Sequence, residues 1–139
     1  MIIDHIGIVV KSIEKGLDLW TKVFAYKQMT EVVVNTRQKV KVVFLKKKDS
    51  IDIKLIEPTD ISSSVYAMAH RGGGLHHLCF KCDDLESELG NLREHGLRVL
   101  TLPEPGEAFQ NEKIAFVFAG QGLNIELIDT EKRAGLIQR

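Results

Sequence analysis

Long apolar runs and an excess of charge of either sign are both absent from this sequence of 139 residues. No stretch approaches the roughly 20 apolar residues that a membrane-spanning helix needs. The 19 basic and 19 acidic residues give a formal net charge of zero, and there is no basic stripe or basic amphipathic segment. These absences argue against a membrane or a nucleic-acid partner. Because strand-like sequence begins at Ile2 with no leader peptide before it, we expect a cytoplasmic protein.

Cysteine is scarce as well. Cys79 and Cys82 are the two in the chain, and their C-x-x-C spacing can indicate zinc or redox chemistry. They fall in a segment typical of a strand, where residues three apart point to opposite faces, so the two thiols cannot share a metal ion. The triplet Gly72-Gly73-Gly74 lacks the Lys-Ser/Thr ending of a phosphate-binding loop and is expected to be a hinge.

The remaining composition is that of an ordinary globular protein, with 44% apolar and 27% charged residues. A chain of this length can bury a core without disulfide bonds. We therefore expect one compact domain that spans residues 1–139.

The first half of the chain predicts one strand, one helix and three further strands. A nearly continuous apolar run predicts a strand over residues 2–10, and Ser12 is a favourable N-cap for the helix that follows. Apolar residues at intervals of four, three and four give that helix one buried face, made of Ile13, Leu17, Trp20 and Phe24. Strands are predicted near residues 31–35, 40–46 and 51–57, with lysines 46–48 in a hairpin turn.

The same order returns after a short predicted helix at about residues 63–70. A strand is predicted over residues 75–82, and Asp83 or Asp84 can cap a helix whose face is formed by Leu85, Leu89 and Leu92. Gly96 is a favourable residue to end that helix. Strands are predicted near residues 98–102, 113–119 and 123–129, with residues 102–111 as a loop that edges a pocket. The order β-α-β-β-β therefore occurs twice.

A shift of the sequence by 72 residues, without gaps, tests this repeat. The shift places residues 53–57 (IKLIE) on residues 125–129 (IELID), Phe44 on Phe116, and His5 on His77. One shift superposes both ends of each half, which indicates duplication of one module. We predict an α+β fold of two tandem βαβββ modules, at about residues 1–70 and 75–130, that form one cup-shaped, mostly antiparallel sheet around a metal pocket.

The repeat singles out His5 and His77, and then Lys54 and Glu126. Each histidine precedes its partner position by 49 residues, so an approximate twofold would gather all four around one axis. A single histidine in an apolar strand is more often a core residue than a ligand. Two at duplicated positions, with a carboxylate inside an apolar run, are harder to explain as core, because a carboxylate is rarely buried without a partner. Two imidazoles and a carboxylate are common ligands of a divalent metal.

Four segments carry a family resemblance: residues 4–10 (DHIGIVV), 53–58 (IKLIEP), 74–78 (GLHHL) and 124–127 (NIEL). In order and over essentially the whole chain, they resemble methylmalonyl-CoA epimerases, which belong to the vicinal-oxygen-chelate superfamily with glyoxalase I, extradiol dioxygenases and bleomycin-binding proteins. The resemblance implies paired βαβββ modules around a divalent metal, often in a homodimer. It also implies that His5, His77 and Glu126 are metal ligands, while His76, of opposite parity to His77, should face away from the pocket.

The fourth ligand of the epimerases, Gln or Glu, is replaced by Lys54 in this chain. A protonated lysine has no lone pair for a metal. Three outcomes stay open: a metal held by two histidines and Glu126, a metal-free site in which Lys54 pairs with Glu126, or a neutral Lys54 amine that ligates the metal.

The resemblance implies a divalent-metal-dependent isomerase or epimerase that removes a proton alpha to a carbonyl or thioester, on a small-molecule substrate such as an acyl-CoA thioester. Glu126 would carry the proton, and Lys54 is the candidate partner, since Val42 stands where some epimerases have a second Glu. Zinc, cobalt, nickel or manganese would suit this chemistry. The alternatives are a glyoxalase I-type lyase on a thiol adduct, an Fe(II) extradiol dioxygenase, and a non-catalytic binding protein in which Lys54 replaces the metal.

Overall fold

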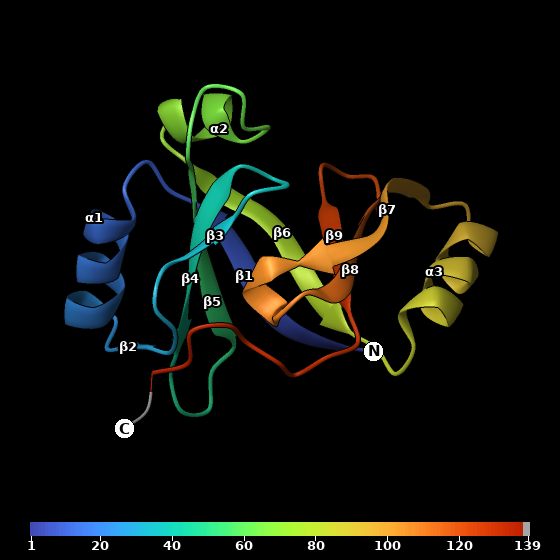
Figure 1. Ribbon diagram of the computed structural model, residues 1–139, viewed down its shortest axis with the longest axis horizontal. Helices are drawn as coiled ribbons and strands as arrows, with labels where there is room; N and C mark the ends of the chain where they lie inside the picture. The colour runs from blue at the N-terminus through green and yellow to red at the C-terminus, as the bar shows by residue number, and fades with distance from the viewer. Residues whose placement is uncertain (138–139) are drawn as a thin grey trace.

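The computed structural model describes residues 1–137, which form an α+β fold around one open, nine-stranded sheet (Figure 1). The strand order is β2-β4-β5-β1-β6-β9-β8-β7, and β3 pairs with β4 beside this path. The strands are β1 (Ile2–Val9), β2 (Lys27–Gln28), β3 (Val33–Asn35), β4 (Val40–Lys46), β5 (Asp52–Pro58), β6 (Gly74–Lys81), β7 (Arg98–Gly106), β8 (Glu112–Phe118) and β9 (Asn124–Ile128). Six strand pairs run antiparallel, whereas β1 with β5 and β6 with β9 run parallel. The predicted mostly antiparallel, cup-shaped sheet is confirmed.

Two helices flank the sheet at opposite sides of the molecule, and a third lies near the end of β5 (Figure 1). They are α1 (Ile13–Asp18), α3 (Leu85–Glu94) and the short α2 (Tyr66–His70). Both predicted N-caps form: the side chains of Ser12 and Asp84 each accept a hydrogen bond from the third residue after them. Gly96, with a φ of 87°, follows the end of α3 as expected.

The sheet separates three apolar clusters. Ile13 of α1 packs with residues of β4 and β5 on the outer face, and Leu85 and Leu89 of α3 pack with residues of β8 and β9 in the same way. The third cluster includes Phe44, Phe109 and Phe116 and fills the inner face. Because successive side chains in a strand alternate, β1 turns its buried residues His5, Gly7 and Val9 to this inner face.

The first helix departs from its predicted periodicity. After Asp18 the chain continues as a π-helical segment, η1 (Leu19–Val23), in which the N–H of Phe24 bonds to the carbonyl of Leu19. A π-helix carries more residues per turn, so the buried stripe rotates away from the positions that a period of 3.6 predicts. Phe24, predicted on the buried face, is 46% exposed.

The predicted loop at residues 102–111 is a second departure. β7 continues through Pro103 and Pro105 to Gly106, and a 3-10 segment, η2 (Glu107–Phe109), follows. Proline normally argues against a strand because it has no N–H to donate. β7 lies at the edge of the sheet, where the missing donor can face away from the neighbouring strand, so both prolines are tolerated.

The segment after β9 crosses from the second half of the molecule back to the first, as the red trace of Figure 1 shows. Ala134 N–H bonds to the carbonyl of Ala108, Glu31 N–H bonds to the carbonyl of Gly135, and Thr30 and Leu136 form an isolated bridge. We call residues 130–137 the C-terminal strap.

The helices of residues 1–137 include none with both the length and the apolar character that a membrane crossing requires. Lysines 47 and 48 lie in the turn between β4 and β5, as predicted.

Candidate functional site

Four neighbouring strands at the centre of the sheet bring one charged or imidazole side chain each to a single buried point. His5 comes from β1, Lys54 from β5, His77 from β6 and Glu126 from β9, and all four are buried. The strand order β5-β1-β6-β9 makes these strands adjacent. The four positions that the repeat singles out therefore converge, although they are far apart in the sequence.

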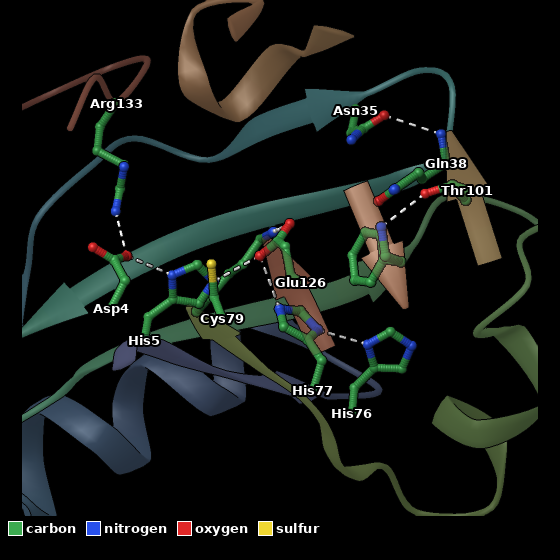
Figure 2. A network of polar contacts seen from close by, with 12 residues as sticks. Asp4, His5, Asn35, Gln38, His76, His77, Cys79, Thr101, Glu126 and Arg133 are labelled. Carbon is green, nitrogen blue, oxygen red and sulfur yellow. Dashed lines mark hydrogen bonds and ion pairs between the residues drawn. The ribbon is translucent and has the colours of Figure 1, made fainter. Parts of the chain in front are cut away.

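Glu126 is the centre of this cluster (Figure 2). Its Oε1 lies 3.0 Å from Nε2 of His5 and 3.1 Å from Nε2 of His77. Its Oε2 lies 3.5 Å from Nζ of Lys54. The two carboxylate oxygens thus have different partners: Oε1 contacts two imidazoles, and Oε2 contacts an ammonium.

The electrostatics of the cluster follow from its burial and its charges. Burial by itself raises the pKa of Glu126, but the Lys54 ammonium and the His5 and His77 imidazoles outweigh it and hold that pKa well below its ordinary value. Burial lowers the pKa of His77 to about 4, against the opposing effect of Glu126. At neutral pH the cluster therefore holds an ionised Glu126 and a neutral His77.

His5 is held from its other side by Asp4. Nδ1 of His5 lies 2.7 Å from Oδ2 of Asp4, and Oδ2 also accepts a hydrogen bond from Arg133. Burial raises the pKa of Asp4, but the hydrogen bond from His5 and the charge of Arg133 bring it below its ordinary value. With its Nδ1 proton directed to the Asp4 carboxylate, His5 turns Nε2 toward Glu126.

The donor atoms of His5, His77 and Glu126 suit a divalent metal. One ligand atom from each lies within 4.8 Å of the other two. Nε2 of His77 is one of two buried side-chain nitrogen or oxygen atoms in residues 1–137 without a hydrogen-bond partner, because its approach to Glu126 does not have hydrogen-bond geometry. A neutral imidazole that directs a lone pair at a carboxylate is repelled unless a cation lies between them. The residues present therefore fit a metal with three protein ligands.

Lys54 does not fit as the fourth ligand. Its Nζ lies 5.8 Å from the ring centroid of Phe44 and 5.2 Å from that of Phe109, besides its contact with Glu126. Two aromatic faces and a carboxylate stabilise a cation at this position. An ammonium cannot donate a lone pair to a metal.

The prediction that His76 faces away from the pocket is wrong. Its Nδ1 lies 2.7 Å from Nδ1 of His77, and its side chain lines the adjoining cavity. The pairing of β1 with β6 explains this, because Gly7 pairs with His77 and Ile8 with Leu75. His76 is the extra residue of a β-bulge, and strict alternation fails at a bulge.

A cavity of about 520 Å³ opens beside the cluster. Val42 and Phe116 are among its apolar wall residues, and Lys54, His76 and His77 line it. The wall also includes polar residues that sequence reasoning did not single out, among them Ser64 before α2, Thr101 and Glu104 within β7, and Asn124 at the start of β9. Glu104 is the one carboxylate among the residues that line this cavity in the described part of the chain.

Comparison with known proteins identifies the family. Residues 4–116 match the family model described as Glyoxalase/Bleomycin resistance protein/Dioxygenase superfamily. The chain belongs to this superfamily. A relative from Bacillus subtilis, the uncharacterized protein YqjC, is 31% identical over 130 residues, which are 91% of each chain. The mitochondrial methylmalonyl-CoA epimerase of Mus musculus is 25% identical over 101 residues, 71% of this chain and 56% of the mouse protein.

Several solved structures agree with this chain in fold over nearly the full length. A hypothetical protein of Bacillus halodurans has a TM-score of 0.83 at 26% identity and covers 96% of each chain. The methylmalonyl-CoA epimerase of Mycobacterium tuberculosis has a TM-score of 0.81 at 26% identity, over 91% of this chain and 86% of that one. A Streptomyces coelicolor methylmalonyl-CoA epimerase in complex with 2-nitronate-propionyl-CoA has a TM-score of 0.80 at 28% identity, over 93% and 96%. The predicted likeness to epimerases within this superfamily is confirmed.

Proposed function

We propose that this protein is a divalent-metal-dependent epimerase-like enzyme that removes and returns a proton alpha to the carbonyl of an acyl thioester. The observation that carries the proposal is the buried Glu126 carboxylate, with two imidazole nitrogens beside Oε1 and the Lys54 ammonium beside Oε2. Two of these partners, Lys54 and His77, line the adjoining cavity. The likeness to epimerases in complex with acyl-CoA compounds supports the substrate class.

His5, His77 and Glu126 are the proposed ligands of a zinc, cobalt, nickel or manganese ion. Such an ion supplies Lewis-acid stabilisation of the negative charge that develops on the carbonyl oxygen when the alpha proton leaves. His5 is directed to this role by the hydrogen bond from its Nδ1 to Asp4, since a ligating histidine is normally oriented through its other ring nitrogen.

Glu126 and Lys54 are the proposed proton carriers. Glu126 is ionised and can accept a proton, and Lys54, on a flexible four-carbon stem, can donate one. Their polar atoms are 3.5 Å apart, so a substrate carbon fits between them only when the Lys54 side chain swings toward the cavity. Lys54 lines that cavity, which gives it the room to do so.

The first test is metal content. Protein purified without chelators is expected to hold about one zinc, cobalt, nickel or manganese ion per chain by elemental analysis. His77→Ala should lose it, and the surface variant Lys41→Met should keep it. An absence of metal from all three proteins would overturn the metal-dependent proposal in favour of a binding protein in which Lys54 is the resident cation.

The second test is exchange of the alpha proton. One alpha-carbon epimer of methylmalonyl-CoA, incubated with the metal-loaded protein in D₂O, should lose its alpha-proton NMR signal and convert to a mixture of both epimers together. Glu126→Gln should abolish exchange, because a glutamine amide is too weak a base to accept the proton. Lys54→Met should retain exchange but slow epimerisation by about 100-fold or more, as for loss of a general acid. Equal rates of both processes in Lys54→Met and wild type would exclude Lys54 as a proton carrier.

One observation favours a second candidate. Because Lys54 contacts Oε2 of Glu126 and not a metal position, the site offers two histidines and one carboxylate, the ligand set of Fe(II) oxygenases. Iron in the purified protein, together with oxygen consumption on catechols, would replace the epimerase proposal with a dioxygenase.

A further inference from the structure

The C-terminal strap places one buried cation against the proposed metal site. Arg133 is 6% exposed, and its Nη2 donates a hydrogen bond to Oδ2 of Asp4. The same Asp4 oxygen lies 2.7 Å from Nδ1 of His5, and Nε2 of His5 lies 3.0 Å from Oε1 of Glu126. Figure 2 shows these four side chains in a row. A continuous chain of polar contacts thus runs from the strap to the centre of the site.

Packing holds both ends of this chain in place. The Arg133 guanidinium lies 4.8 Å from the ring centroids of Phe44 and Phe109. The His5 ring packs edge-on against Phe44 at 5.1 Å and nearly parallel to Phe109 at 6.2 Å. The same two rings therefore fix the orientation of Arg133 and His5. The Asp4 carboxylate lies between the Arg133 guanidinium and the His5 imidazole and contacts both.

The strap itself is anchored on both sides of Arg133. Nη1 of Arg133 donates to the carbonyl of Lys132, and the carbonyl of Arg133 accepts from the side chain of Gln110 at 3.0 Å. Ala134 N–H bonds to the carbonyl of Ala108 at 2.9 Å. These bonds determine where the guanidinium lies, so its contact with Asp4 does not depend on the freedom of a chain end.

The second module offers an internal comparison. The 72-residue shift relates Asp4 to His76, and His76 contacts Nδ1 of His77 as Asp4 contacts Nδ1 of His5. Both are bulge residues of the central strand pair. The position related to Arg133 is Ile61, which is 78% exposed. The duplicated module thus supplies each histidine with a neighbour, but within residues 1–137 only the neighbour of His5 is hydrogen-bonded to a cation from a distant segment.

We infer that Arg133 is a positioning residue of the proposed metal site: it holds the Asp4 carboxylate, which in turn keeps the proton of His5 on Nδ1 and presents Nε2 to the metal. This inference rests on the proposed function, because it assigns a purpose to Nε2 of His5. It makes the C-terminal strap part of the site, although the strap contributes no ligand.

Metal affinity is the first measurement. The dissociation constant for Co²⁺ or Zn²⁺, measured by competition with a chromophoric chelator, should rise about 10- to 100-fold in Arg133→Met, as for loss of a group that orients a ligand. Arg133→Lys, which keeps the charge but not the planar fork, should recover part of this loss. Lys132→Met is the matched control, since it removes a neighbouring cation of the strap that pairs with Glu112, and its affinity should equal that of wild type.

The tautomer of His5 in metal-free protein is the second measurement, and it does not require a metal. Long-range ¹H–¹⁵N spectra of the five histidines should show His5 protonated on Nδ1 in wild type and Lys132→Met. In Arg133→Met and Asp4→Ala this population should shift toward Nε2. Should Arg133→Met prove too unstable, Gln110→Ala loosens the same strap without removing a buried charge and should show the same shift in smaller measure.

The outcomes separate the two proposals. Metal binding in wild type with unchanged affinity and tautomer in Arg133→Met overturns the positioning inference and leaves the proposed function intact. No metal binding in wild type overturns the proposed function and with it the metal-directed part of the inference. The tautomer then tests the remaining part, that Arg133 orients His5 through Asp4: an unchanged His5 in Arg133→Met refutes it, and a shifted one supports it.

Discussion

At the level of single residues, Glu126 is stabilised by partners that differ in kind. Two imidazoles lie against Oε1, and one ammonium lies against Oε2. All of these side chains are buried, so water screens their charges little. Removal of the ammonium would leave a buried carboxylate without a full positive charge beside it. The free energy lost by leaving that charge unpaired exceeds the net free energy that the ion pair contributes to folding.

Lys54→Gln tests this balance. Without metal, the variant should lose about 3–5 kcal/mol in free energy of unfolding, measured by urea denaturation in the presence of EDTA. Added Zn²⁺ or Co²⁺ should raise the melting temperature of the variant by more than that of wild type, because the ion replaces the lost cation and binds the folded state alone. Equal metal-induced shifts in the two proteins would show that Lys54 does not compete with a metal.

Position 7 requires glycine because the His77 side chain leaves no room for a Cβ atom, and not because the backbone has a positive φ there. It pairs with His77 across β1 and β6, and a Cβ at this position would overlap the His77 imidazole. Gly7→Ala should therefore displace His77 and lower the free energy of unfolding by about 1–3 kcal/mol, with loss of metal affinity. Gly90→Ala is the matched control, because nothing lies near its Cβ position in α3. It should stabilise the protein by about 0.5–1 kcal/mol. Tolerance of Gly7→Ala would mean that the imidazole has room to move.

The two cysteines should differ in reactivity. Burial raises the pKa of the Cys79 thiol well above its ordinary value, and burial raises that of Cys82 less. Cys79 is inaccessible in the inner cluster, whereas Cys82 lies beyond the end of β6. A disulfide-exchange reagent at pH 8 should label one thiol in the native protein and two after unfolding. Cys82→Ser should abolish native labelling, and rapid labelling of Cys79→Ser and Cys82→Ser alike would contradict this.

At the level of elements, α1 and α3 begin in the same way. The N–H of Ile13 donates to the Glu57 carboxylate and that of Leu85 to the Asp129 carboxylate, each at 2.8 Å. Glu57 and Asp129 are 72 residues apart, as are Ile13 and Leu85. Each helix is therefore joined to the end of the last strand of its own module by a carboxylate at its positive N-terminal end.

Glu57→Ala and Asp129→Ala should each lower the free energy of unfolding by about 0.5–2 kcal/mol, since each leaves a helix N-terminal N–H without its acceptor. Glu94→Gln, which removes a negative charge from the C-terminal end of α3, is the control of opposite sign and should stabilise by about 0.3–1 kcal/mol. Chemical denaturation measures all three. A neutral result for both alanine variants would show that water replaces these carboxylates without loss.

Local patterns predicted the elements well where pairing is regular. Residues 40–46 form β4 as predicted, and Ser12 and Asp84 cap their helices. The predictions failed where the regular period is interrupted. Parity misplaced His76 because a bulge adds one residue to β6, and a period of 3.6 misplaced Phe24 because the helix widens after Asp18. Neither interruption has a marker residue in the sequence, since both arise from the packing of distant strands and helices.

At the level of the whole molecule, the repeat was the most informative feature of the sequence. It related His5 to His77 and Lys54 to Glu126, and the structure places these four side chains together. The role of Arg133 was not predictable in the same way. The related position in the first module is Ile61, which carries no charge, and the contacts of the strap with Asp4 and Gln110 join residues that are distant in sequence.

Truncation from the C-terminus should show where the strap acts. A chain that ends at Ala134 keeps Arg133 and the bond from Ala134 to Ala108, and should unfold close to the full-length protein. A chain that ends at Lys132 loses the buried partner of Asp4 and should be less stable by about 3 kcal/mol or more. Calorimetry of both chains measures the difference, and equal losses in the two would place the stabilising contacts after Ala134.

The Lys54–Glu126 pair also bears on the origin of the chain. If a single module had assembled as a symmetric dimer, both positions across the twofold would have held the same residue, because an isologous interface repeats every contact. Two lysines at 3.5 Å would repel each other, and so would two glutamates without a metal ion between them. An ion pair of opposite sign on the axis became accessible only once one gene encoded both copies, and each copy could then mutate independently.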